Sequence, residues 1–290
     1  MFFDEEMLLD LRLNIMNKYV DKFIITEATY MHSGQPKKLV FDISKYPKFK
    51  NKIIYRVIDK QPNNLEIITN NDAKDVRGSK LINNSVKREN YQRQMALSSL
   101  EIANDDDIIL VNDIDEIPDF NGINFSYIKN RITFFQQKIF CYKFNLLYKD
   151  LIWYGSRTCK KKKLLSPQWL RNIKPKKYPI WRFDILFSRK KYNNINFIQN
   201  GGWHFTNIKS PVDLEKKFSH FLHHQDFEAS GLKLKDIKEK VKNKKILYDL
   251  DVDQRDYKWS GIKSLTKVPL SEMPDYLSNN YRKYSDWLDN

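Results

Sequence analysis

The sequence predicts an α/β fold, because segments typical of strands alternate with segments that have helical spacing. The run IILV within Asp107–Val111 is short, apolar and β-branched, which is typical of a strand buried in a parallel sheet. A polar segment with helical character precedes it, and a stronger strand, Val20–Ala28, comes before that. In sheets of this kind, ligands bind beyond the carboxyl ends of the strands, so we expect functional residues there.

The first half of the chain divides into regular elements. Apolar residues at helical spacing predict a helix over Asp4–Tyr19. The β-branched and aromatic run Lys52–Ile58 predicts a second strand. Ser85 is a suitable N-cap for a helix that extends to about Ala103. The next strand, Asp107–Val111, ends directly before a group of acidic residues.

The second half is richer in strands and ends in helices. We expect strands over Ile132–Tyr148, Trp181–Ser188 and Gly201–Phe205, and helices over Pro211 to about Gln225 and Leu234 to about Leu250. These elements suggest a catalytic domain over residues 1–230 and a helical C-terminal extension over 231–290 that packs on the core.

Composition limits the type of protein. The chain has 290 residues, of which 41% are apolar, so it suits one large domain with a substantial core. No apolar run approaches the roughly 20 residues that span a bilayer, and the acidic N-terminus does not resemble a signal peptide. Cys141 and Cys159 are the only cysteines, which fits a reducing compartment better than a disulfide framework. We therefore expect a soluble, cytoplasmic protein.

The net charge of +15 calls for an explanation. The charge is concentrated in runs at Lys160–Lys163, Lys174–Lys177 and Lys238–Lys245. Such runs are most often solvated faces. Nucleic acid, an anionic membrane and phosphate-bearing substrates are the partners that would use them, and peripheral contact with an anionic membrane is an interpretation of the run at Lys238.

The acidic segment VNDIDEIPD follows the apolar strand, and it places Asp113 and Asp115 on one face of an extended backbone. Two adjacent carboxylates gain most from a divalent cation, and oxygen ligands favour Mg²⁺ or Mn²⁺. A metal with few protein ligands keeps positions open for substrate phosphates. A D-x-D pair alone, however, is more often an acidic surface turn.

Two further segments carry polar residues that suit a phosphate site. KRENYQRQ places Arg88 and Arg93 on a predicted helix, and guanidinium groups are suitable ligands for phosphate oxygens. An exposed helix with salt bridges would explain the same residues equally well. GGWHF combines two glycines, which allow close backbone approach, with His204, a potential metal ligand. A single histidine is more often structural.

These segments, taken in order, resemble glycosyltransferase family 17. The resemblance rests on FFDEEMLLDLRL, VDKFIITEATYMHSGQPKKL, RENYQRQ, DDDIILVNDIDEIPD and GGWHF, and it extends from Met1 to about Gln225. The family is typified by β-1,4-mannosyl-glycoprotein 4-β-N-acetylglucosaminyltransferases. The resemblance implies a GT-A type fold, in which a Rossmann-like mixed sheet flanked by helices binds a nucleotide-sugar.

The resemblance also implies roles for residues. Asp113 and Asp115 would bind Mn²⁺ or Mg²⁺, with Asp115 as the direct ligand, and His204 would contact the metal or the diphosphate. The candidates for the nucleotide end are Glu27, Arg88, Arg93 and Asp113. Trp153 and Arg171 would shape the acceptor or donor pocket.

The implied reaction is an inverting transfer, with GlcNAc from UDP-GlcNAc as the best-supported donor and a glycan or glycoprotein hydroxyl as the acceptor. A carboxylate base would take the acceptor proton, and Asp184 is the first candidate and Glu116 the second. The vertebrate enzymes are anchored in the Golgi membrane, whereas this chain carries no anchor, which suggests a microbial or viral source.

Two other classes remain open at this stage. A nucleic-acid-binding protein would use the basic runs and aromatic residues, but it gives no reason for acids at a strand end. A metal-dependent nuclease or phosphotransferase would explain the acids, yet such enzymes usually recruit further acidic or histidine ligands. A non-catalytic sugar-binding relative is disfavoured by the presence of Asp113, Asp115 and His204 together.

Overall fold

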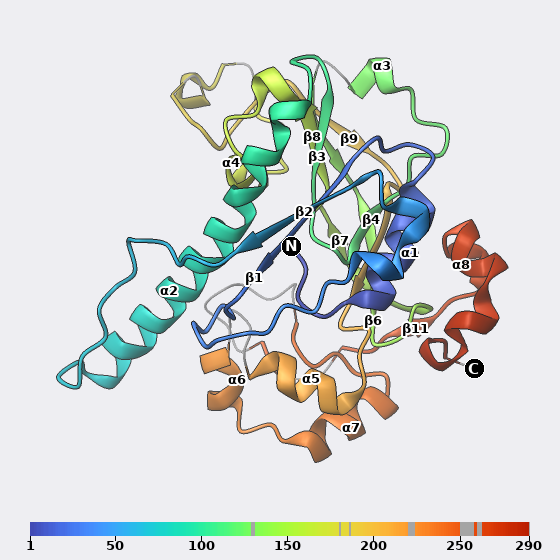
Figure 1. The fold of residues 1–290 in the computed structure, drawn as a ribbon. Coiled ribbons are helices and arrows are strands. Elements are labelled where there is room, and N and C mark those ends of the chain that lie inside the picture. The colour runs from blue at the N-terminus through green and yellow to red at the C-terminus, as the bar shows by residue number, and fades with distance from the viewer. Residues whose placement is uncertain are drawn as a thin grey trace.

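The computed structural model describes residues 1–128, 131–179, 181–185, 187–219, 224–249, 258–259 and 263–289. It confirms a mixed α/β protein (Figure 1). The described strands form three hydrogen-bonded sheets. No helix among the described residues is long and apolar enough to cross a membrane.

The first sheet holds the parallel strands β1 (Phe23–Ala28) and β2 (Ile53–Ile58), paired from Phe23↔Ile53 to Ala28↔Ile58. The second has the order β3-β8-β5-β9, and its strands are Ile108–Val111, Arg157–Lys160, Ile132–Phe135 and Ile195–Ile198. The third has the order β11-β7-β6-β10-β4, and its strands are Thr266–Lys267, Leu146–Trp153, Gln137–Cys141, Gly202–Thr206 and Glu116–Pro118.

Helices surround these sheets (Figure 1). The α-helices are α1 (Glu6–Met16), α2 (Lys74–Gln94), α3 (Phe125–Ile128), α4 (Pro167–Asn172), α5 (Pro211–Phe218), α6 (His224–Ser230), α7 (Leu234–Lys242) and α8 (Asp275–Asn279). The 3₁₀ helices are η1 (Ile43–Lys45), η2 (Pro47–Phe49), η3 (Met95–Ile102), η4 (Lys161–Lys163), η5 (Phe183–Ile185), η6 (Leu270–Glu272) and η7 (Tyr281–Trp287).

The main core forms where α1 packs beside β1 and the C-terminal elements. Leu11 and Leu13 of α1 are fully buried, as is Leu277 of α8, and all three belong to one apolar cluster with Phe205 of β10. A second cluster lies between β6 and β7 on one side and α5 and α7 on the other. The C-terminal segment therefore contributes side chains to the main core and one strand, β11, to a sheet. The division at residue 230 stays a prediction.

Several predicted elements are confirmed, and others are corrected. The helix predicted from Ser85 begins at Lys74 and its last part is 3₁₀. Ser85 lies inside the helix, where its hydroxyl donates to the Leu81 carbonyl, so it is not a cap. The start was missed because residues 74–84 are polar and lack apolar periodicity. The strand β3 is confirmed, but its partner β8 is antiparallel.

The strand predicted over Trp181–Ser188 is wrong. Phe183–Ile185 form the short helix η5, and Asp184 accepts hydrogen bonds from Arg182 directly before it. No described residue of this segment pairs with a strand. Farther along, α5 ends at Phe218, and the rest of the predicted helix includes residues 220–223, which lie outside the described part. The helix α7 ends at Lys242, short of Leu250, which also lies outside it.

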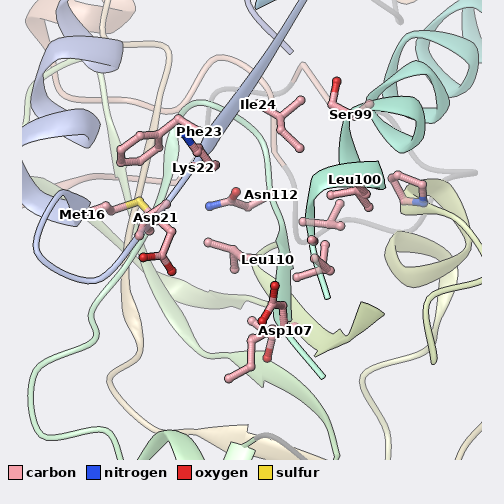
Figure 2. Close-up of a pocket in the computed structure, with 18 of the residues that line it drawn as sticks. Met16, Asp21, Lys22, Phe23, Ile24, Ser99, Leu100, Asp107, Leu110 and Asn112 are labelled. Atoms are coloured by element: carbon pink, nitrogen blue, oxygen red, sulfur yellow. The ribbon is translucent and has the colours of Figure 1, made fainter. Parts of the chain in front are cut away.

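A cavity of about 1030 Å³ lies between β1 and β3, which are not hydrogen-bonded to each other (Figure 2). Phe23 and Ile24 line it from β1, Leu110 lines it from β3, and Leu100 lines it from η3. The cavity ends at Asp113, where the acidic loop begins.

Candidate functional site

The acidic loop connects β3 to β4 and carries Asp113, Asp115 and Glu116. The loop turns tightly, because the Glu116 amide donates to the Asp113 carbonyl. The strand β10 lies against it, with Phe205 donating its amide to the Asp115 carbonyl at 2.8 Å and His204 paired with Glu116 in the sheet. The sheet register thus brings His204 to the loop from about 90 residues away in the chain.

The glycines of GGWHF allow this close approach, as predicted. Gly202 has a φ of +122°, and a Cβ there would lie 2.2 Å from the Ile117 carbonyl oxygen. A side chain at Gly202 would therefore push β10 away from β4 and displace His204.

Both carboxylate oxygens of Glu116 accept hydrogen bonds. Its carboxylate is 1% exposed and accepts hydrogen bonds from the Trp153 indole at 2.7 Å, the Asp113 amide at 2.9 Å and Arg171 at 2.7 and 3.0 Å. Its role in this arrangement is to hold the loop, Trp153 and Arg171 in place.

Asp113 lies between two guanidinium groups. Arg171 contacts one carboxylate oxygen at 2.7 Å and Arg93 the other at 3.2 Å. Burial alone would raise the pKa of Asp113, but Arg171 and Arg93 outweigh it and hold this pKa well below the usual range. Beneath the loop, Arg12 of α1 donates to the carbonyls of Asp113 and Glu116. Arg93 and Asp113 were both predicted to bind the nucleotide; in the structure they form an ion pair with each other, and their contact with a nucleotide stays a prediction.

Among the described residues, no arginine forms an ion pair with Asp115. Its Oδ2 lies 3.5 Å from Nε2 of His204, and the His204 ring stacks on Trp153 with centroids 4.7 Å apart. Burial would raise the pKa of Asp115, but the charges of His204 and Lys217 lower it. The His204 Nδ1 is buried and has no hydrogen-bond partner within the described residues.

A cavity of about 510 Å³ opens at Asp113, Asp115 and Trp153. Its other lining residues are a mixture of polar and apolar ones, and the polar ones are Glu5, Tyr30, His32, Lys37, Glu89, Gln92, Thr206, Asn207, Lys217, Tyr248 and Lys258. The cavity lies at the carboxyl end of β3, where the α/β pattern predicted a ligand site. Its volume suits a small-molecule ligand.

Three predicted site residues lie outside this arrangement. Glu27 is buried in β1 and accepts hydrogen bonds from Lys37, the amides of Val40 and Phe41, and the Tyr55 hydroxyl. It fixes the loop after β1.

Arg88 donates to the Gln61 side chain and the His32 carbonyl, and Asp184 pairs with Arg182 and Lys191. Neither residue lines either cavity described above. Hydrogen bonds from Arg182 and Lys191 lower the pKa of Asp184 to about 2, which makes it a weak proton acceptor.

A divalent cation fits this site through two donors. Mg²⁺ binds each of its ligands at about 2.1 Å, so two neighbouring ligands of one ion lie about 3 Å from each other. Asp115 Oδ2 and His204 Nε2 are 3.5 Å apart, so a small movement would let both bind the same ion. No group of three or more His, Cys, Asp or Glu side chains suited to a metal occurs among the described residues. Water and substrate phosphates would have to complete the coordination.

Comparison with known proteins identifies the family. Glycosyltransferase family 17 matches residues 1–166, which is more than half of the chain and includes the acidic loop and Trp153. The chain belongs to glycosyltransferase family 17. Searches of curated proteins and of solved structures return no match. The chain is therefore a glycosyltransferase, a class whose members generally use a nucleotide-sugar donor and a glycan acceptor.

In this family 17 enzyme, several site residues lie beyond the matched segment. Arg171, His204 and Lys217 come from α4, β10 and α5, and tertiary packing brings all three to the acidic loop. Lys217 was missed by the sequence analysis. It donates to Asn207 at 2.9 Å and lines the cavity. Its only signal in the sequence is its position on the helix that follows the strand carrying His204.

Both cysteines are free and buried. They lie on β6 and β8, in different sheets. Burial raises the pKa of Cys159 to about 12, so this thiol is unreactive at neutral pH.

Proposed function

We propose that this glycosyltransferase binds the diphosphate of a nucleotide-sugar in the cavity at Asp115, through Mn²⁺ or Mg²⁺. The observation that carries the proposal is that Asp115 lines a 510 Å³ cavity and that the buried His204, which does not line it, lies 3.5 Å from the Asp115 carboxylate. Asp115 is the carboxylate of the loop that no arginine of the described ranges contacts, so it remains available to a cation. Family membership favours this interpretation over a nucleic-acid-binding protein or a nuclease.

When bound, the cation would neutralise charge on the departing nucleoside diphosphate. Side chains of the protein would stabilise the remaining phosphate charge and hold the acidic loop in place. Lys217 and Lys258 line the same cavity and would stabilise the charge that grows on the phosphates. Arg171 and Arg93 hold Asp113 and so set the shape of the loop. In this proposal Asp113 positions Asp115, and Asp115 and His204 contact the cation.

The transfer is proposed to invert the anomeric centre, with UDP-GlcNAc as the first donor to test and a glycan hydroxyl as the acceptor. An inverting transfer needs a base for the acceptor proton. Glu116 is held by Arg171 and Asp184 lies away from the cavity. Glu5 and Glu89 line the cavity, but Glu89 is paired with Arg93 as Glu116 is with Arg171, so Glu5 replaces them as the candidate base.

The test is a thermal-shift assay of the full chain with UDP-GlcNAc, UDP-glucose and GDP-mannose, each with and without Mn²⁺. A ligand at 100 times its dissociation constant stabilises the folded state by about 2.7 kcal/mol, which for a chain of this size is a shift of several degrees. We expect this shift to require both Mn²⁺ and one nucleotide-sugar, and to be lost in Asp115→Ala.

Matched variants separate the roles. Lys217→Ala is expected to weaken the nucleotide-dependent shift, whereas Lys235→Ala on the exposed face of α7 leaves it unchanged. Asp184→Asn is expected to keep full transferase activity. The proposal fails if no nucleotide-sugar stabilises the protein with Mn²⁺, or if Asp115→Ala behaves as the wild type does.

A further inference from the structure

The loop between α4 and β9 exposes large aromatic side chains. Trp181, Phe183 and Phe187 are 77%, 75% and 90% exposed, which is unusual for rings of this size. The loop closes on itself, because the Lys174 amide donates to the Lys190 carbonyl at 2.8 Å. It follows α4 in the chain and lies at the edge of the molecule (Figure 1). None of its described residues, which exclude 180 and 186, lines either cavity described above.

The same loop is strongly basic. Residues 174–191 contain seven Lys or Arg residues and one acid, Asp184. Asp184 is already paired with Arg182 and Lys191. The exposed cations that remain are Lys174, Lys176, Lys177, Arg189 and Lys190. The loop thus combines exposed rings with an excess of positive charge.

Two other side chains of the loop are buried, in contrast to the three exposed rings. Tyr178 and Ile185 are buried there. The charged groups of Arg182 and Lys191 lie over the Tyr178 ring at 5.6 and 5.8 Å. The loop therefore has internal packing of its own, and Trp181, Phe183 and Phe187 point out of it.

We infer that residues 174–191 dock on the surface of an anionic phospholipid bilayer. Trp and Phe side chains favour the membrane interface, where their rings enter the boundary between headgroups and acyl chains. Lys and Arg beside them are attracted to anionic headgroups. The net positive charge of the loop is complementary to the negative charge of such a surface. A single strand of nucleic acid would instead need a basic groove along which its backbone runs, and neither cavity includes this loop.

The test is co-sedimentation of the full chain with vesicles of phosphatidylcholine alone and of phosphatidylcholine with phosphatidylglycerol. We expect binding that requires phosphatidylglycerol and weakens with salt. Replacing Trp181, Phe183 and Phe187 together with Ala should abolish binding while far-ultraviolet circular dichroism and the melting temperature stay unchanged, because the three rings are exposed. Brominated lipid should quench the wild type more than Trp181→Phe.

Two variants that lose the same number of positive charges test whether membrane binding depends on this loop or on another basic surface. Neutralising Lys174, Lys176 and Lys177 with Gln should lower the partition coefficient about fivefold per residue. The control carries the same three changes at Lys235, Lys238 and Lys242 of α7, which also lie on an exposed face, and should bind as the wild type does.

Three results would overturn the inference: no binding to anionic vesicles, no effect of the aromatic changes, or an equal loss in the α7 control. Binding of a single-stranded oligonucleotide that the aromatic changes abolish, without vesicle binding, would assign the loop to nucleic acid instead.

Discussion

Arg171 connects the parts of the acidic loop. It contacts Asp113 and Glu116 at 2.7 Å each and also donates to the Gly155 carbonyl. Glu116 is buried, so its charge depends on this guanidinium for compensation. Within the described part of the chain, Asp115, one residue before Glu116, has no arginine ion pair, and its carboxylate lies 3.5 Å from His204. Adjacent carboxylates in one loop thus have different roles because their neighbours differ.

Arg171→Ala is expected to destabilise the protein by about 3–5 kcal/mol, because it leaves the Glu116 carboxylate buried without its cation. The measurement is urea unfolding followed by circular dichroism. The matched control is Arg182→Ala, which removes an ion pair that is open to solvent and should cost less than about 1 kcal/mol. Equal losses in the two variants would contradict the assignment of Arg171 as a structural clamp.

At the scale of elements, the pairing of β10 with β4 decides where His204 lies. His204 pairs with Glu116, and Gly202 pairs with Pro118 at the other end of the register. The backbone can approach this closely only because Gly202 has no side chain and adopts a positive φ. The glycine and the histidine therefore act together: the first sets the strand position that gives the second its contact with Asp115.

Gly202→Ala is expected to cost at least about 1–3 kcal/mol, since an alanine would be strained at this φ and would also clash with the Ile117 carbonyl. The control is Gly78→Ala in α2, where a Cβ meets nothing within 4 Å. That change should stabilise the protein by about 0.5–1 kcal/mol, as expected for Ala in place of Gly in a helix. Thermal unfolding of both variants measures the difference, and a tolerated Gly202→Ala would show that the strand pairing has room to adjust.

At the scale of the whole molecule, the two ends of the chain share one core. Leu277 of α8 and Tyr284 of η7 pack in the same cluster as Leu11 of α1. Lys283 also reaches Asp10 at 2.5 Å. Burial of this kind couples the folding of the C-terminal segment to that of the N-terminal part.

Leu277→Ala is therefore expected to destabilise the whole protein by about 2–5 kcal/mol, as a large-to-small change in a core does. Unfolding should remain a single transition by intrinsic fluorescence and by circular dichroism. Leu165→Ala, at a position 60% exposed, is the control and should stay within about 0.5 kcal/mol of the wild type. Two separate transitions in the wild type would instead support an independently folding extension.

Local sequence pattern was sufficient for much of the fold. The spacing in residues 4–19 predicted α1, and β-branched runs predicted β1, β2 and β3, because apolar periodicity reflects which face of an element is buried. The pattern was misleading for residues 181–188, where aromatic residues that resemble a strand lie on an exposed loop. Burial depends on neighbours from elsewhere in the chain, and a local window does not contain them.

For the candidate site, too, one part could be predicted from the sequence and another part depended on the tertiary structure. The order of motifs was enough to place the chain in family 17. The assignment of Asp113, Asp115 and His204 to a metal site stays a prediction. Only the tertiary structure separated the roles within the acidic loop. The guanidinium groups that hold Asp113 and Glu116 come from α2 and α4, and Lys217 comes from α5, so the electrostatic environment of each carboxylate is set by side chains distant in sequence.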